Sequence, residues 1–204
     1  MLPLTLADLK TTDLTNVREY LLDLLAQYAY TEGDFVLSSG QPSSYYINGK
    51  QVTLRADGAL AIGRLLLAEL PPDTAAVAGL TLGADPIVSA VSTVSAYEER
   101  PVAALIIRKE AKGHGTKAYI EGPTLESGSS VVVLEDVVTT GKSAMLAVER
   151  LRAAGYEVNT VISVVDREQG GQEFYQSQGL TFKALFTIKD IQAIYAVIDR
   201  HTTA

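Results

Sequence analysis

Apolar residues along the chain fall into two patterns, nearly continuous runs and runs that repeat every three or four positions. Runs rich in Val, Ile, Leu and Ala at residues 75–80, 102–107, 131–135 and 158–165 predict buried strands. Residues 86–97 and 143–154 lie between such runs and have helical periodicity, and Gly155 follows the second as a C-cap glycine would. Helices that alternate with buried strands imply βαβ crossovers. The sequence therefore predicts an α/β fold with a central, mostly parallel twisted sheet flanked by helices.

The two ends of the chain depart from this alternation. Residues 16–28 predict an amphipathic helix with Asn16 and Glu19 as a capping box, residues 35–37 and 45–48 predict short strands, and residues 56–70 predict a helix. Residues 117–121 and 182–187 predict strands, and residues 171–178 and 191–200 predict helices. We expect a single domain over 1–204, with an N-terminal helix and hood over about 1–70, a sheet core over about 71–190 and a C-terminal helix over 191–204.

Composition narrows the possible chemistry. The 204 residues are 47% hydrophobic, which is enough for one core, and contain no cysteine, which excludes disulfides, zinc–thiolate sites and thiol nucleophiles. The first residues lack the features of a signal peptide and no long apolar span is present, so we expect a cytoplasmic protein without membrane contact. A net charge of −7 argues against nucleic-acid binding.

The most informative segment is 130–143, SVVVLEDVVTTGKS. Glu135 and Asp136 lie at the carboxyl end of a predicted buried strand, where α/β sheets bind ligands. The following Thr139–Ser143 loop offers hydroxyls and backbone N–H groups at a helix N-terminus, which favour an anion. Acids beside an anion cradle suit a single ligand that carries both a phosphate and sugar hydroxyls.

Other interpretations of this segment are weaker. Residues 141–143 match the end of a nucleoside-triphosphate loop, but that motif requires glycine five positions before Gly141, where Asp136 stands. A metal-binding acidic pocket of the response-regulator kind would leave the Thr139–Ser143 loop without a purpose. A chance succession of strand, turn and helix is the remaining alternative.

A second segment concentrates positive charge. Residues 108–117 hold four basic residues and one acid, a local charge of +3, with His114 between two glycines. In a parallel sheet this segment, residues 79–86, residues 135–143 and the Asp166–Arg167 pair would all meet at one edge. Cations, acids and N–H groups together suit a pyrophosphorylated sugar. An ordinary solvated run of charge is the alternative for the segment alone.

Residues 131–143 are similar to the 5-phosphoribosyl 1-diphosphate (PRPP) motif of the type I phosphoribosyltransferases. The resemblance implies that Glu135 and Asp136 bind the ribose hydroxyls, with Asp136 also a catalytic residue. It also implies that the following residues hold PRPP and its 5′-phosphate: Val137, Val138, Thr139, Thr140, Gly141, Lys142 and Ser143.

The basic segment resembles the catalytic loop of the orotate phosphoribosyltransferase family, R-K-x-x-K-x-H-G, which is matched by Arg108, Lys109, Lys112, His114 and Gly115. In that family the loop acts on the PRPP diphosphate of the neighbouring subunit. The resemblance therefore implies a homodimer in which the 108–117 loop acts in trans, with Lys112 and His114 as catalytic residues. It also implies Mg²⁺ as cofactor, held mainly through PRPP with no direct protein ligand.

Two further segments carry the resemblance. Residues 166–171 match D-R-x-x-G-G, which implies that Arg167 binds the orotate carboxylate and that Thr139 also contacts orotate; an ion pair of Arg167 with a neighbouring acid is the alternative. Tyr46, in the family's F-x-L-x-S-G…Y-[YF] segment, is a candidate to stack on the pyrimidine, and core packing is its alternative. Ser38 and the segment 81–86 lack lysines that contact PRPP in many relatives.

These resemblances imply transfer of the 5-phosphoribosyl group from PRPP to orotate, giving orotidine 5′-monophosphate and diphosphate in pyrimidine biosynthesis. No covalent nucleophile is required. A purine phosphoribosyltransferase of the same fold is the first alternative, against which the basic loop and Arg167 argue. A phosphoribosyltransferase-like RNA-binding regulator is the second, and the net charge of −7 argues against it.

Overall fold

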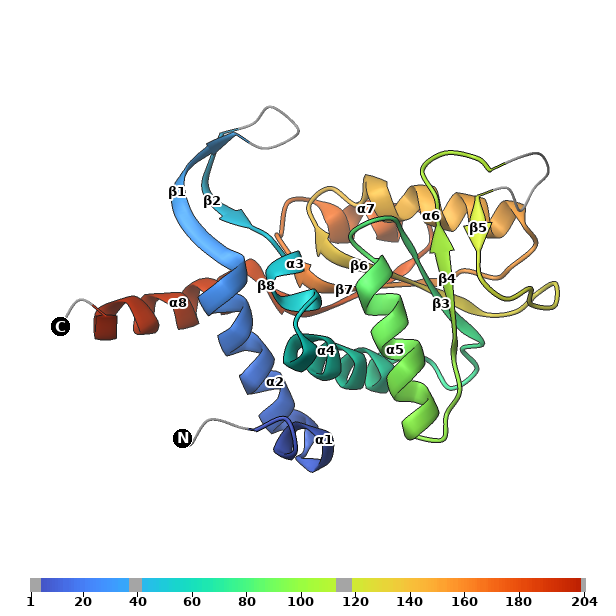
Figure 1. Ribbon diagram of the computed structural model, residues 1–204. Coiled ribbons are helices and arrows are strands. Elements are labelled where there is room, and N and C mark those ends of the chain that lie inside the picture. Colours follow the sequence, from blue (N-terminus) through green and yellow to red (C-terminus); the bar gives the residue numbers. More distant parts are fainter. Residues whose placement is uncertain (1–4, 37–41, 113–118, 203–204) are drawn as a thin grey trace.

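A six-stranded sheet forms the centre of the molecule (Figure 1). The computed structural model describes residues 5–36, 42–112 and 119–202, so the candidates Ser38 and His114 lie outside it. The strand order is β5-β4-β3-β6-β7-β8, and every neighbouring pair is parallel except β4 and β5. The strands are β3 (Ala76–Leu80), β4 (Ala103–Ile107), β5 (Ile120–Glu121), β6 (Val131–Val138), β7 (Thr160–Asp166) and β8 (Thr181–Thr187). The predicted fold class is confirmed.

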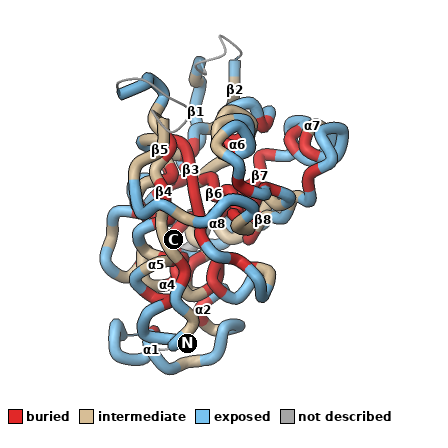
Figure 2. Tube along the Cα trace, turned by 90° about the vertical axis from the view of Figure 1, so that its right-hand side faces the viewer, coloured by how far each residue is buried: buried red, intermediate tan, exposed pale blue. Residues whose placement is uncertain are grey.

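Helices cover both faces of this sheet because its strands are apolar on both sides. On one face α4 (Ala56–Glu69) and α5 (Asp85–Tyr97) pack with α2 (Leu14–Leu24) and α8 (Ile188–Thr202) against residues such as Leu134 and Ile162. On the other face α6 (Lys142–Ala153) and α7 (Gly171–Ser177) pack against residues such as Val133 and Val161. Figure 2 shows the central strands buried and the outer surfaces of the helices exposed. Two apolar layers thus fix where the strand ends lie.

The N-terminal part adds a hairpin to this body. Short helix α1 (Asp8–Thr11) precedes α2, the π-helical turn η1 (Leu25–Ala29) follows it, and α3 (Lys50–Thr53) precedes α4. Between them, β1 (Tyr30–Val36) and β2 (Pro42–Ile47) pair with each other as a separate antiparallel sheet. The hairpin projects from one end of the molecule, and β5 lies at the other (Figure 1).

Several boundaries differ from the sequence predictions, among them the starts of β1 and α8, and the structure gives the reason for two others. The capping box at Asn16 is wrong: α2 begins at Leu14, and the Asp13 side chain accepts a hydrogen bond from the Asn16 N–H at 2.9 Å. Strand β6 runs beyond Glu135 to Val138, since Val137 and Val138 still pair with β7. Glu135 and Asp136 therefore lie within the paired part of β6 and not after its end.

Among residues 5–36, 42–112 and 119–202, none of the helices combines the length and apolar character that crossing a bilayer requires.

Candidate active site

A cavity of about 700 Å³ opens at the carboxyl ends of β6 and β7, beside the hairpin. Its wall brings together residues from four separate parts of the chain. It is lined by Val36, Tyr46, Glu135, Val137, Val138, Thr139, Thr140, Gly141, Lys142, Ser143, Ala144, Arg167 and Tyr175. The predicted Thr139–Ser143 loop, Glu135, Arg167 and Tyr46 are thus in one place. Asp136 and the described residues of the basic segment, 108–112, are not part of this wall.

The loop after β6 is shaped as an anion cradle. Gly141 is the N-cap of α6 and has a left-handed backbone, with φ of +83°. A Cβ at this position would lie 2.8 Å from the Phe174 ring and 2.9 Å from the Tyr175 ring, so α7 presses directly on the loop. Only glycine meets both conditions. The loop consequently presents backbone N–H groups and the first turn of a twelve-residue helix to the cavity.

Glu135 is buried, with 8% of its surface exposed. Its Oε2 receives no hydrogen bond from any residue that the structure describes. Burial raises the pKa of Glu135 well above its usual value, and the charge of Asp136 and a hydrogen bond shared with that carboxylate raise it further. Lys109 and Lys50 act in the opposite direction on this pKa. Burial therefore favours the protonated form of Glu135 in the ligand-free protein.

Asp136 is positioned by backbone. Its Oδ1 accepts a hydrogen bond from the Val137 N–H at 2.9 Å. A Cβ on Gly83 would lie 2.7 Å from that oxygen, and one on Gly49 would lie 3.4 Å from Oδ2. The turn after β3 therefore abuts this carboxylate. Gly83 was noted from the sequence for a missing lysine, and the structure gives it a reason to carry no side chain.

Arg167 is held under the hairpin, with only 7% of its surface exposed. Its Nε donates to the Tyr45 hydroxyl at 3.2 Å, its Nη2 donates to Ser43 Oγ at 3.4 Å, and its Cζ lies 4.7 Å from the Tyr45 ring centre. No ion pair to a neighbouring acid is found among the described residues, and Glu168 pairs with Lys189 instead. A guanidinium has five N–H groups, so donors remain for a carboxylate from the cavity.

Tyr46 lies on the same hairpin and is 46% exposed. Its ring centre lies 5.6 Å from that of Phe35 on the paired strand. Because half of the side chain is accessible and it lines the cavity, it is not a core residue. A flat ligand can reach its ring.

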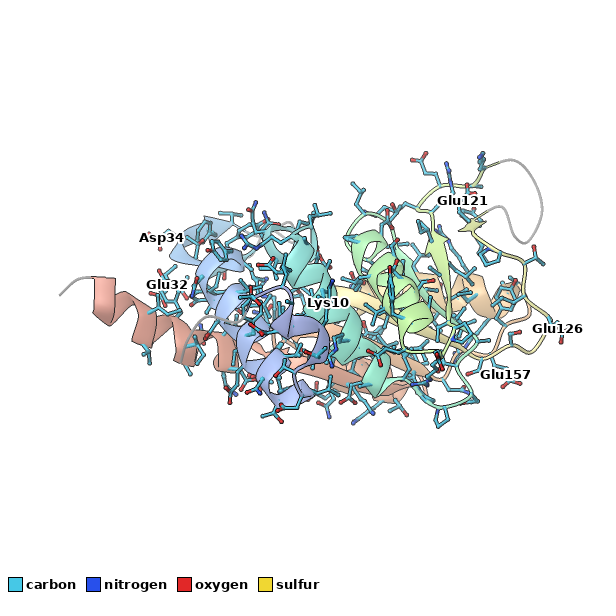
Figure 3. The ribbon with its side chains drawn as sticks, turned by 60° about the horizontal axis from the view of Figure 1, so that its bottom comes forward. Lys10, Glu32, Asp34, Glu121, Glu126 and Glu157 are labelled. Atoms are coloured by element: carbon cyan, nitrogen blue, oxygen red, sulfur yellow. The ribbon has the colours of Figure 1, made fainter. Side chains whose placement is uncertain are left out.

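The described part of the basic segment, residues 108–112, does not line the cavity. Arg108 and Lys112 both pair with Glu121 on β5, at 3.2 and 3.7 Å. Glu121 and the hairpin residue Asp34 lie at opposite ends of the molecule (Figure 3). Of the described cations, those that line the cavity are Lys142 and Arg167. His114 lies outside the described residues.

Sequence reasoning missed Tyr175. Its side chain is fully buried, its ring contacts the Gly141 turn, and its hydroxyl has no hydrogen-bond partner among the described residues. Burial raises the pKa of this hydroxyl, and the charges of Glu135 and Asp166 raise it further. An aromatic residue in a short helix is an ordinary core signal, so no pattern in the sequence marks it as part of a cavity.

The donor set around Glu135 suits a cation that a ligand shares. In the described part of the chain, no three acids or histidines are grouped closely enough to enclose a metal ion. The unpartnered Oε2 of Glu135 and the carboxylate of Asp136 are hard oxygen donors. Mg²⁺ commonly takes one or two such carboxylates and completes its shell with waters and substrate phosphates. The residues present fit that mode.

Comparison with known proteins identifies relatives by sequence and by structure. No family model matches the chain. It is 80% identical over 195 residues to the orotate phosphoribosyltransferase of Synechocystis sp., which covers 96% of this chain and 98% of that protein. It superposes with a TM-score of 0.75 and 37% identity on a crystal structure of Mycobacterium tuberculosis orotate phosphoribosyltransferase, over 86% of this chain and 98% of the other. A structure of the same enzyme in complex with PRPP gives 0.71 and 34%, over 86% and 99%.

Proposed function

The chain belongs to the orotate phosphoribosyltransferases, and we propose that the cavity beside β6 is where it takes its two substrates. The protein transfers the 5-phosphoribosyl group of PRPP to orotate, which yields orotidine 5′-monophosphate and diphosphate in pyrimidine biosynthesis. One observation carries the placement: a single wall holds an anion cradle, a buried carboxylate and a buried guanidinium. Each suits a different part of the substrate pair.

The ribose phosphate takes the end of β6. The N–H groups and hydroxyls from Thr139 to Ser143 bind the 5′-phosphate at the positive end of α6. Glu135 and Asp136 accept hydrogen bonds from the ribose hydroxyls, which supply the donors that Glu135 Oε2 lacks. Val137 and Val138 form the apolar wall between these two groups.

Orotate takes the side of the cavity under the hairpin. The guanidinium of Arg167 offers parallel N–H groups to the orotate carboxylate, and Thr139 contacts the pyrimidine from the loop. The half-exposed ring of Tyr46 stacks on the base. A neutral or purine base would leave the buried charge of Arg167 unpaired, which accounts for selection of a carboxylated base.

Breaking the bond from C1 to the diphosphate leaves positive charge on the ribose and negative charge on the leaving group. Asp136, fixed by its backbone contacts, faces the positive charge. Arg108, Lys109, Lys112 and His114 neutralise the diphosphate. Arg108 and Lys112 pair with Glu121 and do not line the cavity of their own subunit, which supports the assignment of the 108–117 loop to the cavity of a second subunit in a homodimer.

Mg²⁺ would be held mainly through PRPP, and Glu135 and Asp136 are the carboxylates that would share it. It supplies charge neutralisation of the diphosphate. The cytoplasmic location inferred from the sequence stays a prediction.

The substrate assignment is tested with purified protein, PRPP and Mg²⁺, by following orotate absorbance in the ultraviolet. Orotate should be consumed, whereas adenine, hypoxanthine and uracil should not react. Chelation of the metal should abolish turnover, and added Mg²⁺ should restore it. Reaction of another base in place of orotate would overturn the assignment.

The shared site is tested by mixing two inactive variants, Lys112→Ala and Arg167→Ala. If the basic segment acts in trans, a mixed dimer has one intact site, and equal mixing should restore about a quarter of wild-type activity for random pairing. Mixing Lys112→Ala with Asp136→Ala should restore activity equally, since these two residues also belong to different subunits of one site. A mixture that stays inactive would place the basic segment in its own subunit's cavity.

A further inference from the structure

The basic segment leaves the sheet and returns to it through a narrow stem. It departs after Ile107 at the end of β4 and returns at Ile120 on β5. Where the two arms meet, the Arg108 N–H donates to the Tyr119 carbonyl at 2.8 Å. The placement of Arg108, Lys109 and Lys112 therefore depends on how this stem is fixed to the body.

One side chain from another element contacts both arms of the stem. Arg150 of α6 donates one hydrogen bond from Nη1 to the Arg108 carbonyl and another from Nη2 to the Lys109 carbonyl, the second at 2.9 Å. Its guanidinium carbon also lies 4.0 Å from the centre of the Tyr119 ring. A planar guanidinium can make both kinds of contact at once, at its edge and on its face.

The ion pairs of the stem are weaker contacts. Glu121 pairs with Arg108 and Lys112, but these side chains are between 38% and 70% exposed. Ion pairs at such a surface contribute little and are screened by salt. Arg150 is half-buried and holds backbone atoms, so its contacts fix the arms and not only the charged tips.

Arg150 also lies on the helix that begins at the anion cradle. Gly141 caps α6, and Arg150 follows on the same unbroken helix, which ends at Ala153. A helix of this length is a rigid element, so the cradle and the stem keep a fixed relation to each other. The helix thereby joins the anion cradle, which would hold PRPP in its own subunit, to the stem of the basic segment, which would act on PRPP in the partner subunit.

We propose that Arg150 is a positioning residue, which sets the place of the diphosphate-binding cations by holding both arms of their stem to α6. It contacts no substrate itself. The proposal rests on the function proposed above for Arg108, Lys109 and Lys112.

The test compares Arg150→Ala with Arg152→Ala in the full-length protein. Arg152 lies on the same helix and also donates to a backbone carbonyl, that of Val158, but does not touch the stem. Arg150→Ala should lower kcat by about tenfold to a hundredfold, the usual cost of misplacing a catalytic group by about 1 Å, and leave the KM for orotate within about twofold. Arg152→Ala should leave kcat near wild type at a similar loss of thermal stability. Equal kcat in the two variants would overturn the proposal.

Conservative substitutions separate positioning from general stability. Arg150→Lys keeps the charge but cannot span two carbonyls and stack on a ring, so it should stay as slow as Arg150→Ala. Tyr119→Phe keeps the ring and should retain wild-type kcat, whereas Tyr119→Ala should lose part of it and add little to the defect of Arg150→Ala. Full rescue by lysine would contradict the proposal.

Lys112→Ala separates failure of the function proposed for the basic segment from failure of the role proposed for Arg150. If this variant keeps its kcat, the cations are idle and the proposed function of the segment fails. If it loses kcat while Arg150→Ala does not, the segment acts as proposed and only the role of Arg150 fails.

Discussion

The position of the Asp136 carboxylate depends on the absence of a side chain at a neighbouring glycine. Gly83 leaves room for the carboxylate, and a Cβ there would come within 2.7 Å of Oδ1. We expect Gly83→Ala to turn this short side chain away, because the carboxylate yields more easily than the backbone. The kcat should fall by about tenfold or more, with a small change in the midpoint of thermal unfolding.

Gly49→Ala provides the matched control for this prediction. It approaches the same carboxylate from the other side, at 3.4 Å, which is an ordinary contact. Steady-state kinetics of both variants, with melting curves, compare the two approaches. Equal activity of the two alanine variants would show that crowding at Gly83 does not control the carboxylate.

The raised pKa of Glu135 predicts how stability depends on pH. In the unfolded chain the carboxyl ionises near its ordinary value of 4.5, whereas burial in the folded state keeps the proton to higher pH. Below pH 4.5 both states are protonated; above it the unfolded state is favoured by up to about 1.4 kcal/mol per pH unit, until the folded-state pKa is passed. The stability of ligand-free wild type relative to Glu135→Gln should therefore fall as pH rises from 4.5.

Urea unfolding of both proteins between pH 4 and 8 measures this difference. Glu126→Gln, at an exposed position before β6, is the control for the loss of one carboxyl group. A difference between Glu135→Gln and wild type that does not vary with pH would mean that folding leaves the pKa of Glu135 unchanged.

At the residue scale the sequence indicated the site chemistry but not the contacts. Residues 135–143 are contiguous, so their place at a strand end could be predicted from the pattern alone. The partner of Arg167, Tyr45, lies 122 residues earlier, and its neighbour Tyr46 was singled out instead. Contacts at such separations depend on tertiary packing, which periodicity does not encode.

At the scale of elements, two helices have a glycine N-cap with a left-handed backbone, and the two glycines have different surroundings. Gly141 before α6 and Gly170 before α7 both have a left-handed φ, +83° and +92°. A Cβ on Gly141 would strike two rings, whereas one on Gly170 would meet nothing within 4 Å. Both alanine variants should lose about 1 kcal/mol through the backbone, and Gly141→Ala should lose about 1–3 kcal/mol more through overpacking.

Denaturant unfolding and PRPP binding by calorimetry check this pair. Gly141→Ala should also weaken PRPP binding because its loop is displaced, and Gly170→Ala should bind PRPP as wild type does. Equal losses of stability would show that the rings of α7 move aside at no cost.

Element types were easier to predict than their limits. The alternation of apolar runs gave α4 and α5 to within a residue, because strong periodicity marks the interior of an element. The ends depend on single hydrogen bonds: Asp13 starts α2 before the predicted position, and pairing with β7 carries β6 to Val138. The two short strands expected around one turn do pair with each other as β1 and β2, but β1 begins at Tyr30, well before the predicted strand at residues 35–37.

At the scale of the whole molecule, charge separates this protein from nucleic-acid binders. A net charge of −7 repels a phosphate backbone, although residues 108–117 are locally basic. We expect negligible binding of a labelled single-stranded RNA at physiological salt, measured by fluorescence anisotropy. Binding that weakens steeply with added salt would show that the basic segment attracts polyanions despite the overall charge.

The sheet as a whole was predictable as parallel, but its strand order was not. The sequence runs from β3 to β4, yet β6 pairs on the other side of β3 and becomes central. This reversal places the end of β6 between the ends of β3 and β7, and the pairing with β7 brings the anion cradle and Arg167 into one cavity. Right-handed crossovers limit such orders to a few but do not select one.

Arg167 joins two parts of the molecule that share no strand pairing, the hairpin and the main sheet. If a bound carboxylate takes the Nε–H in place of the Tyr45 hydroxyl, ligand binding and hairpin position become linked equilibria. By reciprocity, a bound carboxylate favours release of the hairpin from Arg167 by the same factor by which release of the hairpin raises the affinity for the carboxylate. The affinity for the base would then depend on the difference in free energy between the two hydrogen-bonding arrangements of Arg167. A change at Tyr45 would therefore alter this affinity as well as a change at Arg167.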